Sequence, residues 1–240
     1  IQGVTSLLSD HPKGLKTLFL TEMWERMSFY GMRGILVLFM TASLINGGLN
    51  IDSVSASATY GIYTAGVYLV ALLGGWIADR HIGQQNAILY GGFIIMLGHF
   101  LLAFTNINTF YLGLIFVVLG TGLLKPNISA IVGGLYEKDQ EKKESGFTLF
   151  YMSINIGSIL GFFICGYLGE NIGWHYGFGA AGIGMLAGLI VFWKGINANV
   201  LGDKGLQPAE YIGKKIAGIS ITNLTYILGL VAVPVFAYLI

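Results

Sequence analysis

Charged residues are scarce in this chain. Lys, Arg, Asp and Glu make up 10% of its 240 residues, against about 25% in an average soluble domain, which is too little charge to cover a surface that faces water. The net charge of +1 gives no basic footprint for nucleic acid. The single cysteine, Cys165, excludes an intramolecular disulfide framework and a cysteine-clustered metal site.

Catalytic motifs are missing as well. The sequence contains no paired histidine ligands, no H-E-x-x-H and no G-x-S-x-G, which are patterns of zinc and serine hydrolases. We therefore predict that the chain is not an enzyme and that it has no catalytic residue, no metal and no cofactor.

Long apolar runs are what the chain has instead. Hydrophobic residues make up 55% of it, and the mean hydropathy is +0.72. A helix needs roughly 20 apolar residues to cross a hydrocarbon core of about 30 Å. Runs such as GLIFVVLGTGLL (113–124) do not alternate as barrel strands do. The sequence predicts an all-α integral membrane protein with apolar segments at about 14–45, 54–78, 86–105, 108–135, 147–168, 173–193 and 216–240.

Three regions follow from these segments. Residues 14–193 are predicted to form a six-transmembrane-helix amino-terminal bundle, and residues 194–215 a cytoplasmic linker. Residues 216–240 predict a further apolar helix, either a seventh span or an accessory one. The chain starts at Ile1 and stops inside an apolar run at Ile240, so we expect both ends to be cut from a longer protein.

The basic residues predict the orientation in the lipid bilayer. Connections at 46–53, 105–108 and 169–172 contain no Lys or Arg. Because cytoplasmic loops carry an excess of basic residues, the amino terminus is expected to be cytoplasmic. The basic residues on that side are Lys13, Lys16, Arg80, Lys138, Lys142, Lys143, Lys194, Lys204, Lys214 and Lys215.

Five charged residues fall inside the predicted helices. An ionisable side chain at the centre of a span costs roughly 2.5–3.5 kcal/mol, so these groups must pair with one another or line a wet cavity. At about 100° per residue, those on the first helix share one side of it with Tyr30. The five are Glu22, Glu25, Arg26, Arg33 and Lys125.

Spacing and burial cost alone leave more than one role open for these charged residues. Arg33 has no acid three or four positions away, which favours a cavity and an anionic ligand. Lys125 precedes Pro126, so it either marks a kink where a glutamate of the first helix neutralises it, or changes partner with proton or substrate occupancy. A structural salt-bridge cluster that joins the first and fourth helices is the alternative.

Uncharged polar side chains also lie at membrane depth. Asn155 follows Tyr151 by one turn of the fifth helix and is either packing glue or part of a site. The second helix carries Tyr60, Tyr63 and Tyr68, and Tyr68 lies too deep to be an interfacial anchor.

Four motifs resemble those of a known family. They are EMWERMSFYG (22–31), GGWIADRHIG (74–83), GTGLLKPN (120–127) and FTLFYMSINIGS (147–158). In this order and on these helices they resemble the proton-coupled oligopeptide transporters of the major facilitator superfamily. The resemblance covers residues 14 to about 205. Family members have two six-helix halves with the site between them, so we expect this chain to be the amino-terminal half.

The resemblance implies roles residue by residue. Proton coupling would involve Glu22 and Glu25, and the cytoplasmic gate would include Asp79 and Arg80. The substrate-binding residues would be Arg26, Tyr30, Arg33, Tyr68, Lys125 and Asn155. The implied function is proton-coupled symport of di- and tripeptides into the cell across the inner membrane by alternating access, with the carboxy-terminal half as partner.

Departures and competing functions remain. Met27 and Phe29 replace a usual phenylalanine and a frequent tyrosine, and Gly61 stands where animal members have a histidine. Gln84 and Gln85 replace a basic pair that often follows the loop glycine, which weakens the expected charge latch. The alternatives are a transporter of another small solute, such as nitrate or an amino acid, and a non-transporting membrane subunit.

Overall fold

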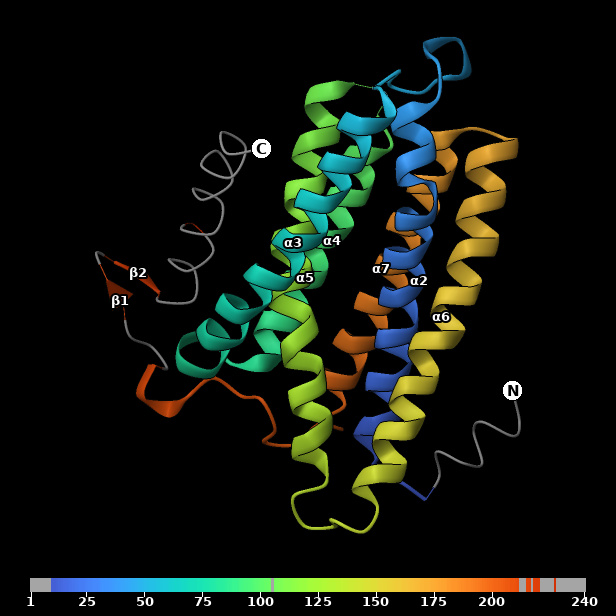
Figure 1. The fold of residues 1–240 in the computed structure, drawn as a ribbon. Helices are drawn as coiled ribbons and strands as arrows, with labels where there is room; N and C mark the ends of the chain where they lie inside the picture. The colour runs from blue at the N-terminus through green and yellow to red at the C-terminus, as the bar shows by residue number, and fades with distance from the viewer. Residues whose placement is uncertain (1–9, 105, 212–214, 217, 221–226, 228–240) are drawn as a thin grey trace.

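Six long helices form one bundle in the computed structural model of this chain (Figure 1). The structure describes residues 10–104, 106–211, 215–216, 218–220 and 227. The long helices are α2 (Lys13–Thr41), α3 (Ser53–Ile77), α4 (Gln84–Leu102), α5 (Ile107–Leu135), α6 (Lys143–Asn171) and α7 (Trp174–Asn197). The all-helical prediction is confirmed for the bundle.

Short elements connect or follow these helices. They are the 3₁₀ turns η1 (Leu44–Asn46) and η3 (Ala209–Tyr211), the π-helical turn η2 (Ala78–Ile82), and the strands β1 (Lys215–Ile216) and β2 (Ile219–Ser220). The two strands pair antiparallel, with Lys215 opposite Ser220 and Ile216 opposite Ile219.

Observed helix ends differ from the predicted ones where polar residues lie. The first helix ends at Thr41 and not at residue 45, and the chain continues through η1. By contrast, α6 starts four residues earlier and ends three residues later than predicted, at Lys143 and Asn171. The added turns are polar, and a helix can continue past the apolar core because its backbone groups bond to each other.

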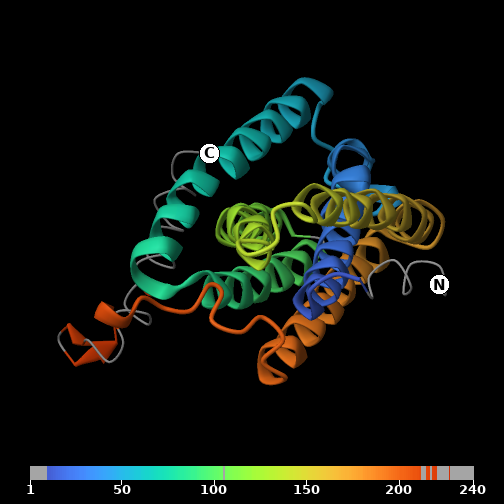
Figure 2. The same cartoon turned by 90° about the horizontal axis from the view of Figure 1, so that it is seen from below.

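Two groups of three helices make up the bundle. One contains α2, which packs on α6 and α7, and the other contains α5, which packs on α3 and α4. Contacts between α4 and α7 join the groups. In the view from below, α5 lies between α3 and the group of α2, α6 and α7 (Figure 2). Triplets of this kind are typical of transporters built from repeats.

Glycines set the distance between α2 and α6. A Cβ added to Gly157 would lie 2.3 Å from the carbonyl oxygen of Met23, and one added to Gly161 would lie 2.4 Å from that of Met27. Any larger side chain would push the helices apart, as the small-xxx-small pattern predicts.

Five helices meet the requirements for crossing a membrane by length and composition alone. They are α3 together with η2, α4, α5, α6 and α7. The remaining long helix, α2, has the four interior charges identified from the sequence, and it lies against α6 and α7 as a sixth member of the bundle.

The segment after α7 differs from the prediction at one boundary. Ile216, Ile219 and Ser220 are strand residues, so the further apolar helix does not begin at residue 216. Residues 221–226 and 228–240 lie outside the described part of the chain. A seventh helix within 216–240 and the cytoplasmic linker at 194–215 therefore stay predictions.

Candidate functional site

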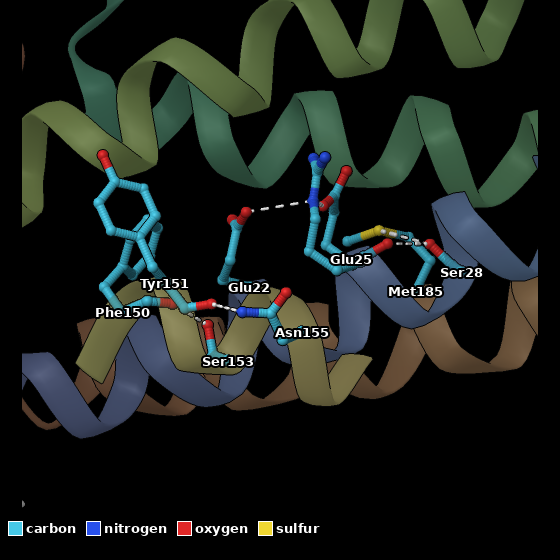
Figure 3. A network of polar contacts seen from close by, with 9 residues as sticks. Glu22, Glu25, Ser28, Phe150, Tyr151, Ser153, Asn155 and Met185 are labelled. Carbon is cyan, nitrogen blue, oxygen red and sulfur yellow. Dashed lines mark hydrogen bonds and ion pairs between the residues drawn. The ribbon is translucent and has the colours of Figure 1, made fainter. Parts of the chain in front are cut away.

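Glu22, Glu25 and Arg26 form a buried cluster on α2. Their exposed fractions are 3%, 0% and 2%. The Nε of Arg26 lies 3.1 Å from Oε1 of Glu22 and donates a hydrogen bond to Oε2 of Glu25. Figure 3 shows both glutamates on α2, with Glu22 joined to the arginine by a dashed line. Of the two alternatives that the sequence left for the charges of the first helix, pairing is the arrangement seen for these three residues.

The buried cluster retains unused hydrogen-bonding atoms. Within the described part of the chain, Oε2 of Glu22, Oε1 of Glu25 and Nη2 of Arg26 have no hydrogen-bond partner. The Arg26 guanidinium also lies 5.0 Å from the centre of the Phe29 ring. Two carboxylates share one guanidinium in a space closed to water, which is a costly arrangement for a purely structural ion pair. A proton arriving at the cluster would find a carboxylate oxygen ready to accept it.

Close packing of α6 seals the cluster on one side. A Cβ added to Gly157 would lie 2.9 Å from Cβ of Arg26. The fifth predicted helix therefore contributes to this site through the absence of a side chain, at the position two residues after Asn155.

Arg33 and Lys125 define a second region, which we call the cationic face. Arg33, on α2, donates from Nε to the hydroxyl of Tyr60 on α3, and its Cζ lies 5.2 Å from the centre of that ring. Lys125, on α5, places Nζ 5.0 Å from the centre of the Tyr68 ring, also on α3. Each cation thus lies against a tyrosine, and both tyrosines belong to α3.

In the described part of the chain, no carboxylate forms a direct ion pair with the cationic face. Among the residues that the structure describes, neither Arg33 nor Lys125 has an acidic oxygen within 4.0 Å. Both side chains are only partly buried. Lys125 therefore forms no direct ion pair with a glutamate of the first helix within the described residues, although Glu22 is close enough to interact with it electrostatically, and α5 continues through Pro126 to Leu135.

Tyr30 and Asn155 lie apart from these two cations in their contacts. Tyr30 packs against Phe162 of α6, with ring centres 6.2 Å apart. Asn155 is exposed and donates from Nδ2 to the carbonyl oxygen of Tyr151, 3.3 Å away (Figure 3). Its exposed position is the opposite of that expected for a residue that serves only as packing glue.

Asp79 and Arg80 lie in η2, at the end of α3. Both are exposed. Asp79 accepts a hydrogen bond of 2.9 Å from Nε2 of Gln84, and Arg80 places Cζ 5.6 Å from the centre of the Trp76 ring. Within the described residues the two do not form an ion pair with each other.

Tyr60 is a residue that sequence reasoning did not assign to the site. It was visible as one of three tyrosines on the second helix. Its pairing with Arg33 joins two helices across 27 positions of sequence. Spacing within one helix cannot reveal such a pair, because it depends on how α2 and α3 pack.

The comparisons decide the family. The model of the POT family matches residues 85–205, which is just over half of the chain. The chain belongs to the POT family. The predicted resemblance to the proton-coupled oligopeptide transporters is confirmed at this level.

Individual POT-family proteins agree with this assignment. The chain is 49% identical over 185 residues to the peptide transporter YePEPT of Yersinia enterocolitica, covering 76% of this chain and 36% of that protein. It is 41% identical over 220 residues to the di-/tripeptide transporter of Lactococcus lactis subsp. cremoris, covering 90% of this chain and 44% of that protein.

A solved structure shows the same architecture. The crystal structure of a peptide transporter POT in complex with sulfate superimposes with a TM-score of 0.81 at 42% identity, covering 95% of this chain and 46% of that one. The chain thus spans less than half the length of these relatives. It corresponds to the amino-terminal half of a POT-family transporter, as the sequence predicted.

Proposed function

We propose that this chain is the amino-terminal half of a transporter that carries di- and tripeptides into the cell together with protons. The observation that carries the proposal is the cationic face: Arg33 and Lys125 are partly exposed, each lies against a tyrosine, and neither has an acidic oxygen within 4.0 Å among the described residues. A peptide carboxylate would supply the missing negative charge. Similarity to proteins named as peptide transporters supports this substrate class.

Substrate contacts would divide between the two groups of helices. Arg33 and Lys125 would bind the peptide carboxylate, because charge-assisted hydrogen bonds are the strong ones. Tyr30, Tyr68 and Asn155 would contact the peptide backbone from α2, α3 and α6. The peptide amine would meet an acid of the carboxy-terminal half.

Proton coupling would arise in the buried cluster. Arg26 is held by both Glu22 and Glu25. Protonation of one glutamate removes half of that hold and frees the guanidinium to attract an anionic substrate group. Proton and peptide would then bind cooperatively, and the coupling must be reciprocal.

The proposed orientation places the amino terminus and the α3–α4 and α5–α6 connections in the cytoplasm. It rests on the distribution of basic residues, which are absent from the connections at the opposite end of the bundle. In a bacterial cell this membrane would be the inner one.

The test is uptake of a labelled dipeptide by the full-length transporter in proteoliposomes with an inward proton gradient. Arg33→Ala and Lys125→Ala are each expected to lower uptake about ten- to a hundredfold, because each removes a contact between ionised groups. Lys138→Ala is the matched control, because Lys138 is exposed in the connection between α5 and α6. A protonophore should abolish accumulation.

Three results would redirect the proposal. Competition by nitrate or single amino acids, with none by peptides, would indicate another small solute. Misfolding of Arg33→Ala, in place of a binding defect, would favour a non-transporting subunit. Undiminished accumulation by Glu22→Gln against a gradient would contradict the role of the buried cluster in proton coupling.

A further inference from the structure

Residues 202–207, which follow α7, lie across the loop between α3 and α4, and we call them the strap. Gln85 binds the strap twice. Its side-chain Nε2 donates to the carbonyl oxygen of Lys204 at 2.7 Å, and its backbone N–H donates to that of Gly205 at 2.9 Å. Gln207 holds the other edge by donating from Nε2 to the carbonyl oxygen of His81 at 2.9 Å.

Two glycines let the strap lie close to the loop and to the start of α4. Gly83, in the loop, has a φ of +78°, and a Cβ added there would lie 2.5 Å from the backbone nitrogen of Gln207. Gly205, in the strap, has a φ of +72°, and its Cβ would lie 3.0 Å from that of Gln84. The left-handed conformation favours glycine at both positions, so the fit is encoded in the sequence of both segments.

The strap is also attached to the end of α5. Nζ of Lys204 lies 2.6 Å from Oε2 of Glu137, and this hydrogen bond raises the pKa of Lys204. Lys204 lines an open pocket of about 560 Å³, and Asp79 lines the same pocket. The strap is therefore connected to three separate parts of the cytoplasmic end.

Gln85 occupies a position where the resemblance led us to expect a basic residue. Gln85 is 7% exposed, and its amide donates to a carbonyl oxygen of the strap in place of an acid. Its neighbour Gln84 donates to Asp79. The two glutamines thus have different partners, because Gln84 binds Asp79 and Gln85 binds the strap.

We propose that Gln85 is a positioning residue for the cytoplasmic gate. By fastening the strap to the start of α4 it fixes the adjoining η2, and with it Asp79 and Arg80, so that detachment of the strap accompanies movement of the gate. The expected effect on transport rests on the proposed function. The attachment itself can be measured without any substrate.

The experiment uses the full-length transporter and follows hydrogen exchange of the peptides that contain residues 85 and 202–207. Gln85→Met keeps the length of the side chain and removes the donor, so exchange should be about three to ten times faster. Gln85→Lys keeps a donor and should stay close to wild type. Gln140→Met is the matched control, because Gln140 is an exposed cytoplasmic glutamine that bonds only to carbonyls of its own turn.

Transport kinetics then test the consequence. In Gln85→Met the maximal rate of peptide uptake should change about three- to tenfold, with KM nearly unchanged, because the variant alters the gate and not the cationic face. Gln207→Met, which removes the second attachment, should act in the same direction and serves if Gln85→Met does not fold.

Each outcome decides a separate point. Unchanged hydrogen exchange in Gln85→Met, or an equal increase of exchange in Gln140→Met, would contradict the attachment of the strap by Gln85. Faster exchange with an unchanged maximal rate would overturn the link to the gate. If the wild-type protein carries no peptide and Gln85→Met still exchanges faster, the proposed function fails while the attachment of the strap stands.

Discussion

Arg26 and Arg33 lie seven residues apart on the same side of α2, yet their surroundings are opposite. Arg26 is buried, shares two carboxylates and is sealed by the approach of α6 at Gly157. Arg33 is partly exposed, lies against Tyr60 of α3 and has no acidic oxygen within 4.0 Å among the residues that the structure describes. The two arginines thus end in a closed ionic cluster and on an open face, because Arg26 has Glu22 and Glu25 on its own helix and because different helices pack beside them.

The difference separates stability from recognition. A buried ion pair contributes little net stability, but removal of one partner leaves the other charge unpaired and costs a great deal. Removal of a cation from an open face lowers the stability of the protein only slightly, but it also removes the contact that a ligand would make. Substitution of Arg26 should therefore affect mainly stability, and substitution of Arg33 mainly ligand binding.

The largest expected effect is on Arg26. Arg26→Ala leaves Glu22 and Glu25 buried without a cation and should lower the unfolding free energy by about 3–5 kcal/mol. The measurement is thermal unfolding of the full-length protein in detergent. Arg33→Ala is the comparison and should unfold close to wild type. Addition of Glu22→Gln and Glu25→Gln to Arg26→Ala should restore part of the loss, and equal destabilisation by both arginine variants would remove the distinction.

The next effect concerns the helix that closes the buried cluster. Gly157→Ala places a methyl group 2.3 Å from the carbonyl oxygen of Met23 and should destabilise the protein by about 1–3 kcal/mol. Gly166→Ala is the matched control on the same helix, because nothing lies within 4 Å of its added Cβ. Similar melting temperatures for the two variants would show that α6 does not seal the cluster tightly.

A smaller effect is expected on the cationic face. Tyr60→Phe keeps the ring under Arg33 but removes the hydroxyl acceptor, so KM for peptide should rise about threefold to tenfold, which corresponds to about one hydrogen bond. Tyr63→Phe is the control, because the Tyr63 hydroxyl is buried without a partner in the described part of the chain. An unchanged KM in Tyr60→Phe would mean that the aromatic face alone positions Arg33.

The smallest effect lies outside both regions, at the start of α3. Asp52 caps this helix, and hydrogen bonds from the Ser55 side chain and backbone hold its pKa below the usual value. The cap is therefore present at neutral pH and is lost as the pH falls through that lowered pKa. Asp52→Ala should lower the melting temperature slightly at neutral pH, and the difference should vanish in acid.

Asp52→Asn separates the two contributions to this cap. Asparagine keeps an acceptor oxygen and is a good N-cap residue, so its melting temperature should stay near wild type and depend less on pH. A pH-independent difference between wild type and Asp52→Ala would contradict the role of the ionised carboxylate.

Periodicity and the cost of burying charge were enough to predict much of the site. Glu22, Glu25 and Arg26 had to pair or to line a wet cavity, because spacing places them on one side of a helix and isolated charges do not persist in lipid. Prediction failed where the partner lies on a segment that is distant in sequence. Tyr60 with Arg33 and Gln85 with Lys204 are joined across 27 and 119 positions of sequence.

The sequence by itself determined a membrane bundle of six long helices, their order, and the charges that cannot face lipid. These follow from local composition, because apolar length and helical period are properties of one segment. Only the tertiary structure decided which helices pack beside each arginine and how a neutral amide attaches the strap. Those outcomes depend on how closely helix backbones approach. This distance is set jointly by the glycines of one helix and the side chains of another.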